Sequence, residues 1–505
     1  MERIRLIVTS DMHAHVFPHS YADGREVNEG MGRVSTLVEL LKTDNTLLLD
    51  NGDLIEGSPL AAYHYAQKRD DISPMTTMMY EMGYNYINVG NHDFSYGEEA
   101  LLMHLQNAGV PCLTGNWLFH GKPFGPTYSV EEMAGKKICL FGLVTHCIPN
   151  WEKRENLRHS RFTNALESAK KTVDTIRRME KPDYIICLYH GGFERDPQNG
   201  LYLTEDNGEN QAYQIISEVP GIDVLITGHQ HSSLCGRMNN TVYTQTAPDG
   251  KELAVIDIYP ESGAIDARLY PVDTEPDTDL LRYVKQEEES CQAWLDEKVG
   301  AATMDLRVED AYRARKEKHQ LVTFFNKVMM EAGEAQLAGS YLHNDTRGFH
   351  GEITRRDLFN AWPHANTVVV KKVTGKVLKE YLERCAEYWC VRGEEVTVSP
   401  LFEKPKPRHS SYDMVDGVEY TIKVSNPVGR RITALTYQGK DVADDDEFTL
   451  CVNSYRAGGG GNFPMLKEAE TVKVLPGNVI TLACDYLAAH PILDFEPVSN
   501  IHLEK

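Results

Sequence analysis

Five short polar clusters in the first half of the sequence contain side chains that commonly bind divalent metal ions. Each follows an apolar run, and together they are Asp11-Met12-His13, Gly52-Asp53, Asn91-His92-Asp93, His190 and His229-Gln230-His231. Nitrogen and oxygen donors without a thiolate suit Mn, Zn, Fe, Co or Mg better than they suit a structural zinc site. The number of donors is sufficient for two ions, and the two oxygens of Asp53 could bridge them. Two carboxylates neutralise only part of the charge of two divalent ions, so the site stays positive and attracts phosphate.

Each cluster taken alone has an ordinary structural explanation. A histidine such as His190 after an apolar strand is more often a hydrogen-bonded core residue, and Gly-Asn-His is also a common turn sequence. We assign His15, His19 and His64 to this structural explanation. The occurrence of all five clusters at the ends of predicted strands, in one chain, argues against an accidental origin.

The elements that must position these clusters are short apolar strands separated by helices. Up to about Ile258 this alternation predicts layered α/β structure. The predicted strands are Ile4–Val8, Thr46–Leu49, Tyr86–Val89, Lys137–Val144, Tyr184–Tyr189 and Val224–Thr227, and the helices include Met31–Leu41 and Glu98–Asn107. The carboxyl ends of strands form the ligand crevice of open α/β sheets. We therefore expect five strands to direct their ligands to one place.

The length of 505 residues exceeds what one hydrophobic core usually organises, so two domains are expected. The segment 273–305 becomes acidic and then helical, with apolar residues roughly on one face, which predicts a connecting helix. Later runs at 317–335, 367–373, 377–388 and 420–424 indicate a second α/β domain. We predict a catalytic domain over 1–272, the linker helix over 273–305 and a substrate-binding domain over 306–505.

Composition limits the partners. The sequence has 41% hydrophobic and 25% charged residues, which is typical of a folded protein. Its formal net charge of -22 argues against binding to polynucleotides, whereas a small anionic substrate remains compatible with a locally positive pocket. No stretch is long and apolar enough to span a membrane, and the first residues enter a predicted core strand without an apolar leader. A cytoplasmic location, reduced cysteines and no membrane partner are therefore expected. The oligomeric state stays open.

The five clusters, written Asp11-x-His13, Gly52-Asp53, Gly90-Asn91-His92-Asp93, His190 and Gly228-His229-x-His231, resemble the signature of the calcineurin-like metallophosphoesterases. The C-terminal half resembles the substrate domain of the 5'-nucleotidase family through Asn366–Val369 and Asn453–Pro464. The segments Ser411–Tyr420 and Asn453–Arg456 are most similar to the bacterial 2',3'-cyclic-nucleotide 2'-phosphodiesterase/3'-nucleotidase branch. The resemblance implies an α/β protein with an N-terminal four-layer α/β/β/α domain, a connecting helix and a smaller C-terminal α/β domain.

The resemblance also implies a role for each matching residue. One metal would be held by Asp11, His13, Asp53 and His231, and the other by Asp53, Asn91, His190 and His229, so that Asp53 is the bridge. His92 would contact the phosphoryl group as the catalytic residue. Tyr412 and Tyr455 would stack on the base, with core packing as the alternative for both, and Arg347 falls near a phosphate-binding arginine of the family.

The activity implied is hydrolysis of 2',3'-cyclic nucleotides and 3'-nucleotides, by attack of a hydroxide held between the two ions. One position departs from the 5'-nucleotidase pattern, because Ser95 occupies the place of an acidic residue that orients the catalytic histidine. We therefore expect His92 to hold its proton less tightly, which favours the cyclic substrates. A 5'-nucleotidase or nucleotide-sugar hydrolase is the alternative. A non-catalytic nucleotide sensor is a further alternative, against which the intact His92 argues.

Overall fold

The computed structural model describes residues 2–203, 206–362, 366–403 and 407–505, and the chain divides into two compact units. The first unit ends at Gln292 and the second begins at Ala293. This division lies within helix α8 (Lys285–Leu295), inside the segment for which a connecting helix is predicted. Among the described residues, no helix combines the length and the apolar character needed to cross a bilayer.

The first unit is built on two main β-sheets. The order of the five-stranded sheet is β14 (Ala264–Pro271), β13 (Glu252–Tyr259), β1 (Ile4–Thr9), β2 (Thr46–Asp50) and β3 (Tyr86–Ile87). The order of the six-stranded sheet is β11 (Leu234–Met238), β12 (Thr241–Gln245), β10 (Val224–Thr227), β9 (Tyr184–His190), β7 (Lys136–Val144) and β6 (Ser129–Met133). A small sheet joins β5 (Lys122–Pro123), β4 (Trp117–Phe119) and β8 (Ser160–Phe162).

Helices cover these sheets. They are α1 (Met31–Leu41), α2 (Pro59–Gln67), α3 (Pro74–Met82), α4 (Glu98–Ala108), α5 (Ala165–Met179), α6 (Ala212–Glu218) and α7 (Thr278–Leu281). Short 3-10 helices are η1 (His92–Phe94), η2 (Ile148–Asn150) and η3 (Arg154–Leu157). The starts of α2 and α3 are locally encoded, because Ser58 and Ser73 cap the free backbone amides and a proline follows each of them.

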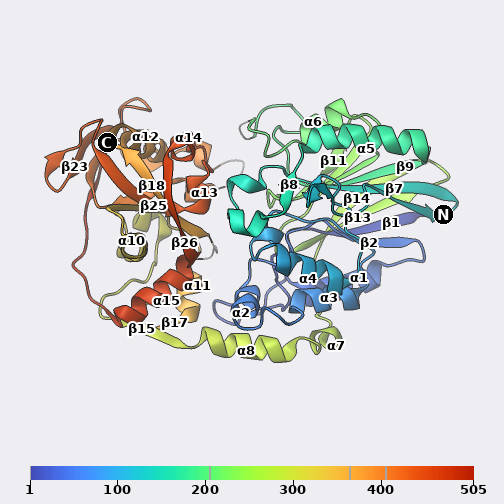
Figure 1. Cartoon of the computed structure of the whole chain (residues 1–505), viewed down its shortest axis with the longest axis horizontal. Coiled ribbons are helices and arrows are strands. Elements are labelled where there is room, and N and C mark those ends of the chain that lie inside the picture. Colours follow the sequence, from blue (N-terminus) through green and yellow to red (C-terminus); the bar gives the residue numbers. More distant parts are fainter. Residues whose placement is uncertain (1, 204–205, 363–365, 404–406) are drawn as a thin grey trace. The chain divides into compact units, whose positions relative to one another are not determined.

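Alternation of side chains along the strands produces the layers of this unit. In β1, Ile4, Leu6 and Val8 belong to a buried cluster that includes Ile186 of β9 and therefore lies between the two sheets. The next residue of β9, Cys187, points the other way and packs with apolar side chains of α5 and α6. Figure 1 shows α5 and α6 along the second sheet and α1, α3 and α4 along the first. The predicted four-layer α/β/β/α order is confirmed.

All six strands predicted in this half are present, and their ends differ from the prediction by at most two residues. Five further strands of the two main sheets lie outside the prediction: β6, β11, β12, β13 and β14. In the edge strands β6, β11 and β14, covered and exposed positions largely alternate, so none of these three forms a continuous apolar run. The pattern that indicates a buried strand is therefore weak at these edges.

The second unit surrounds its own hydrophobic core. Its five-stranded sheet has the order β21 (Met414–Asp416), β16 (Leu337–Ser340), β25 (Glu447–Asn453), β18 (Thr367–Thr374) and β26 (Glu470–Asn478). Smaller sheets contain β17 (Gly351–Thr354), β15 (Lys298–Ala302) and β27 (Ile492–Leu493); β19 (Trp389–Arg392) and β20 (Glu395–Val398); and β24 (Lys440–Asp441), β23 (Ile432–Tyr437), β22 (Glu419–Lys423) and β28 (Ile501–Glu504).

The helices of this unit complete a second α/β structure. They are α9 (Ala311–Lys316), α10 (Gln320–Gly333), α11 (Arg355–Ala361), α12 (Gly375–Ala386), α13 (Ser454–Ala457), α14 (Pro464–Glu468) and α15 (Val479–Ala489), with 3-10 helices η4 (Pro400–Phe402) and η5 (His409–Ser411). Helix α10 contributes much of the core through Leu321, Phe324 and Val328. All ten cysteines of the chain are free.

Candidate metal centre and active site

The predicted metal ligands of the first unit lie at the ends of parallel strands of both sheets or in the loops that follow them. In the first sheet, Thr9 at the end of β1 pairs with Asp50 at the end of β2. In the second sheet, Tyr189 of β9 pairs with Thr227 of β10. The two loop sets meet, since the backbone N–H of His229 donates to Asp11 Oδ1 at 2.9 Å. Packing of the two sheets therefore brings together ligands that are far apart in the sequence.

Five of the seven predicted ligands have a left-handed backbone conformation. Their φ values are 55° for Asp11, 47° for His13, 57° for Asp53, 70° for His229 and 53° for His231. Such a conformation costs a non-glycine residue about 1–3 kcal/mol, and it persists only where surrounding contacts hold it. Here the amides of Asp11 and His13 donate to the carbonyls of Gly52 and Asp53, both at 2.9 Å. Strain concentrated in this way is typical of a functional site.

A buried carboxylate, Asp93, ties the central loops together. It is 3% exposed, and it accepts backbone hydrogen bonds from Asp53, Leu54, Ile55 and Gly90 at 2.7–3.1 Å. The approach is so close that a Cβ on Gly90 would lie 2.2 Å from Asp53 Oδ1. Asp93 therefore fixes the backbone of Asp53, a structural role that the GNHD pattern alone did not reveal.

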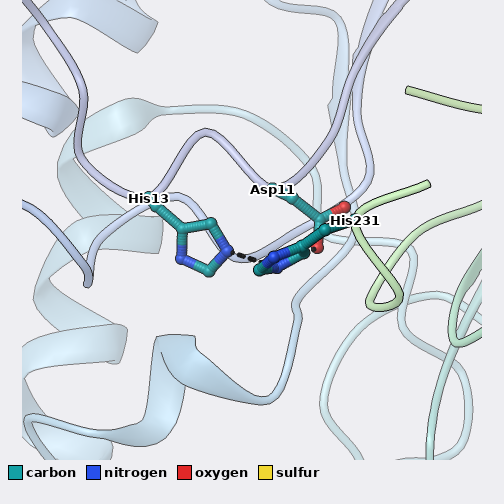
Figure 2. Close-up of side chains that lie close together, drawn as sticks. All are labelled: Asp11, His13 and His231. Carbon is teal, nitrogen blue, oxygen red and sulfur yellow. Dashed lines mark hydrogen bonds and ion pairs between the residues drawn. The ribbon is translucent and has the colours of Figure 1, made fainter. Parts of the chain in front are cut away.

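The first group of ligands consists of Asp11, His13 and His231 (Figure 2). The backbone carbonyl of Glu56 lies 3.0 Å from His13 Nδ1, and since a carbonyl only accepts, Nδ1 carries the hydrogen. The Nε2 lone pair of His13 then faces His231 Nε2 at 2.9 Å, while Asp11 Oδ1 lies 3.6 Å from the same His231 atom. Two nitrogens and an anionic oxygen thus converge on one point.

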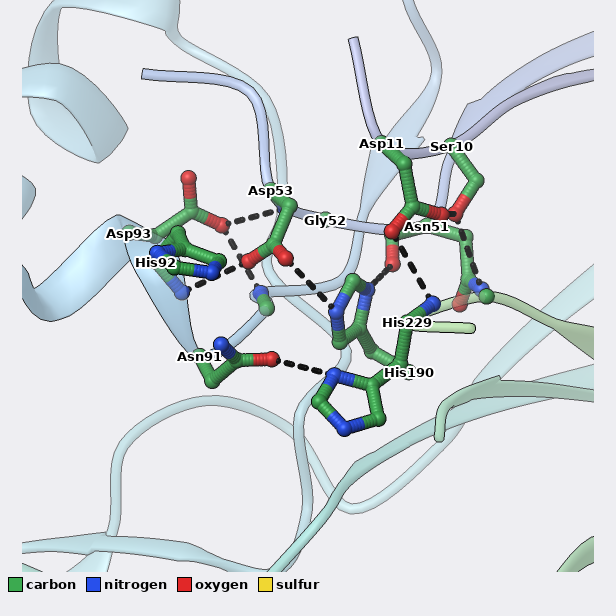
Figure 3. Close-up of polar contacts among 12 residues, drawn as sticks. Ser10, Asp11, Asn51, Gly52, Asp53, Asn91, His92, Asp93, His190 and His229 are labelled. Atoms are coloured by element: carbon green, nitrogen blue, oxygen red, sulfur yellow. Dashed lines mark hydrogen bonds and ion pairs between the residues drawn. The ribbon is translucent and has the colours of Figure 1, made fainter. Parts of the chain in front are cut away.

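The second group consists of Asp53, His190 and His229, with Asn91 beside them (Figure 3). His190 Nδ1 donates to the carbonyl of Asn51 at 2.7 Å, so Nε2 is directed at Asp53 Oδ2, 3.1 Å away. Both of these atoms are buried, and among the described residues neither has a polar partner besides the other. A lone pair facing a buried carboxylate oxygen requires a proton or a cation between them.

His229 is held differently from the other histidines. Its Nδ1 lies 2.7 Å from Asn91 Oδ1, and its Nε2 lies 3.0 Å from the carboxylate of Glu209. A carboxylate on Nε2 retains the hydrogen there and leaves the Nδ1 lone pair available to a cation, which is the usual outer arrangement of a metal-binding histidine. Glu209 was not identified from the sequence, because nothing in its loop indicates that it meets His229. Trp151 also stacks on the His229 ring.

These donor sets fit two divalent cations. The structure brings together Asp11, His13 and His231 in one group and Asp53, His190 and His229 in the other, with Asn91 hydrogen-bonded to the second. Burial lowers the pKa of His190, but the charges of Asp53 and Asp11 and its hydrogen bonds raise it to about 9. The proton held there occupies the position at which a cation would be bound. A bridging role for Asp53 stays a prediction.

The histidines assigned to structural roles lie in other contacts. His15 contacts Glu29 at 3.2 Å, His19 contacts Glu288 at 2.9 Å, and His64 contacts Glu287 at 2.6 Å. The last two pairs join α8 to the body of the first unit.

His92 lies beside the first group, with its ring centroid 5.5 Å from that of His13 and its side chain 42% exposed. Its Nδ1 lies 3.0 Å from the carboxylate of Glu56, which is 7% exposed. Burial lowers the pKa of His92, but the charges of Glu56 and Asp53 and the hydrogen bond to Glu56 raise it to about 10. The expectation that Ser95 leaves His92 without a negative partner is therefore wrong. The argument from Ser95 toward cyclic substrates is lost with it.

In the second unit, the two predicted stacking tyrosines differ in exposure. Tyr455 is 38% exposed and lies in α13, directly before the loop that contains Gly460. Tyr412 is 1% exposed, its ring stacks on Tyr388 at 5.0 Å, and its edge contacts Trp389. In this structure Tyr412 has no exposed face for a base, in contrast to the prediction, because the core packing that was its alternative explanation covers it.

The loop that carries Tyr455 is anchored by a buried ion pair. Arg456 donates to Asp413 through Nε at 2.6 Å and Nη2 at 3.1 Å, and Tyr381 donates to the same carboxylate at 2.6 Å. Arg456 also donates to the carbonyl of Gly460. Arg347 is exposed, and its carbonyl accepts from Val308. Its predicted phosphate contact stays a prediction.

Comparison with known proteins gives matches over both units. Residues 4–233 match the model of the calcineurin-like phosphoesterases, and residues 298–468 match that of the 5'-nucleotidase C-terminal domain. The trifunctional nucleotide phosphoesterase YfkN of Bacillus subtilis is 26% identical over 93% of this chain, which spans 36% of that longer protein. A 2',3'-cyclic-nucleotide 2'-phosphodiesterase/3'-nucleotidase of Haemophilus influenzae is also 26% identical, over 96% of this chain and 84% of that protein. The crystal structure of a putative 5'-nucleotidase from Staphylococcus aureus, in complex with alpha-ketoglutarate, is 30% identical with a TM-score of 0.92, and the match covers 100% of each chain.

Proposed function

Because this chain belongs to the calcineurin-like phosphoesterases that carry a 5'-nucleotidase C-terminal domain, we propose that it hydrolyses 2',3'-cyclic nucleotides and 3'-nucleotides. One observation carries the metal-dependent part of this proposal. Asp53 Oδ2 and His190 Nε2 face each other at 3.1 Å in a fully buried position that lacks any other partner among the described residues. The relatives named for cyclic and 3'-nucleotides support the choice of substrate.

Two bound divalent ions would activate the attacking water and neutralise phosphoryl charge. The chain's own ligands would leave that site positively charged, since Asp11 and Asp53 contribute only two negative charges and the histidines are neutral when bound. His92 has its Nδ1 occupied by Glu56, so Nε2 is the nitrogen available to the substrate. From there it stabilises phosphoryl charge or gives its proton to the leaving oxygen.

Hydrolysis of a cyclic substrate requires two additions of water. The first breaks one phosphorus–oxygen bond of the ring, and the leaving 2' oxygen takes up a proton, which gives the 3'-monophosphate. The second breaks the remaining ester bond, and the 3' oxygen takes up a proton to release the nucleoside and phosphate. In the second unit, exposed Tyr455 is proposed to stack on the base and exposed Arg347 to contact phosphate.

A 5'-nucleotidase or nucleotide-sugar hydrolase is the second candidate. Two observations favour it: the full-length likeness to a putative 5'-nucleotidase, and the carboxylate of Glu56, which gives His92 the negative partner that Ser95 lacks. A nucleotide sensor without catalysis is disfavoured, since a partly exposed His92 held by a buried carboxylate has no purpose in a pure binder.

The test is to incubate the protein with Mn and a panel of 2',3'-cyclic, 3'- and 5'-nucleotides and to separate the products. We expect cyclic and 3'-nucleotides to be turned over, and Asp53→Ala to abolish both steps. Asp266→Ala, an exposed aspartate of β14, is the matched control and should retain activity. Exclusive turnover of 5'-nucleotides would overturn the substrate assignment, and full metal-dependent activity of Asp53→Ala would overturn the site. Elemental analysis of the purified protein identifies the metal.

A further inference from the structure

We propose that Glu56 is the positioning residue for His92, supplying from a different loop the carboxylate that Ser95 does not provide. The inference rests on the proposed function, because it assigns a partner to the residue that acts on the substrate there. Glu56 Oε2 lies 3.0 Å from His92 Nδ1, with the carboxylate 7% exposed and the imidazole 42% exposed. The buried Glu56 carboxylate therefore holds the ring, and the exposed part of the His92 imidazole faces outward.

The backbone around Glu56 is fixed on both sides. The amides of Leu54 and Ile55 donate to Asp93 at 2.9 and 3.1 Å, and the Glu56 carbonyl accepts from His13 Nδ1. Gly57 follows with a φ of 137°, so closely packed that a Cβ there would lie 2.6 Å from His13 Cβ. These contacts fix the backbone at Glu56, and burial of the residue restricts its side chain, whose carboxylate is directed at His92.

Ser95 is engaged elsewhere. Its amide donates to the carbonyl of His92 at 3.0 Å, within the turn that follows η1, and its hydroxyl is hydrogen-bonded to the carboxylate of Glu152. Its carbonyl accepts from Asn156. The hydroxyl is therefore committed to Glu152, and the loop after Asp53 supplies the acidic partner of His92.

A carboxylate on Nδ1 determines which nitrogen of an imidazole carries the outward hydrogen-bonding function, and it holds the plane of the ring. Because the ring of His92 is otherwise 42% exposed, loss of this contact frees it to rotate away from the metal groups. Glu56 thus acts on the substrate only through His92. This is the property that an experiment can isolate.

The experiment compares Glu56→Ala and Glu56→Gln with the wild type on a nucleotide that the wild type hydrolyses. We expect Glu56→Ala to lower kcat about 10- to 100-fold, which is less than the whole contribution of a positioned acid-base group because His92 itself remains, while KM changes little. Glu56→Gln retains an oxygen acceptor for Nδ1–H and should recover part of the loss. Both variants keep the backbone carbonyl that binds His13, so both should retain the metal content of the wild type. Ser95→Ala is the matched control, and its kcat should be unchanged.

A double-mutant cycle with His92→Ala decides whether Glu56 acts through His92. If it does, Glu56→Ala has no further effect in the His92→Ala background. An equal loss in both backgrounds, a loss of metal from the Glu56 variants, or wild-type kcat in Glu56→Ala would each overturn the inference. Failure of the proposed function is a separate outcome: in that case the wild type hydrolyses none of the nucleotides, or His92→Ala has wild-type activity.

Discussion

Replacing Glu209 by glutamine is expected to weaken metal binding at the second ligand group and leave the first group unaffected. The carboxylate of Glu209 contacts His229 Nε2 at 3.0 Å and so leaves Nδ1 available to a cation beside Asn91. Burial raises the pKa of Glu209, but the hydrogen bond and charge of His229 lower it below the ordinary value, so Glu209 is ionised at neutral pH. The substituted side chain would keep an oxygen acceptor and lose the charge.

The size of the effect follows from the geometry. Changing an outer partner of a ligating histidine typically costs about 10- to 100-fold in metal affinity, or about 1.4–2.7 kcal/mol. The Glu209 side chain is 25% exposed, so water partly screens its charge and partly replaces its contact. We therefore expect the lower end of this range, about tenfold, for Glu209→Gln, and a larger loss for Glu209→Ala.

The assay is a calorimetric titration of metal-free protein, in which two ions should bind in separable steps. Only the step assigned to the group of Asp53, His190 and His229 should weaken. Fluorescence of Trp151, which stacks on His229, reports the same step. Glu218→Gln, an exposed glutamate of α6 paired with Lys170, serves as the control. Equal weakening of both steps, or no weakening of either, would refute the reasoning.

Four further predictions concern proton release, the pH dependence of stability, a buried ion pair and the close packing of the loops. Metal binding should release protons near neutral pH, because the His190 ring must lose its Nε2 hydrogen to bind a cation. Burial lowers the pKa of this ring, but Asp53 and its other neighbours raise it to about 9. Binding heats that are equal in buffers of different ionisation enthalpy would contradict this proton release. By the same pKa shift, the metal-free protein should lose stability as the pH rises from about 6.5 to about 9. Asp413→Asn should destabilise the second unit by about 3–5 kcal/mol, because Arg456 stays buried without its counter-charge, and urea unfolding with an unshifted midpoint would rule this out. Gly90→Ala should remove at least one ion from a folded protein, since the new methyl would lie 2.2 Å from Asp53 Oδ1; elemental analysis that still finds two ions would disprove it.

Strands and ligands were predictable because their signals are local. An apolar run such as Ile4–Val8 and the polar residues directly after it lie within a few positions of each other, and parallel strands end at a common edge. The left-handed conformations of Asp11 and Asp53, however, are held by hydrogen bonds between loops. Aspartate adopts this conformation more often than most residues do, but the residue type alone does not predict it at a given position.

The sequence by itself determined the fold class, the seven candidate metal ligands, the candidate catalytic histidine and the second α/β unit. Only the tertiary structure decided which side chains support them. Glu56 and Glu209 reach His92 and His229 from other loops, and the burial of Tyr412 depends on Tyr388 and Trp389. The physical reason is that residue type and spacing specify what a segment forms locally. The partner of a side chain is selected by how distant segments pack against it.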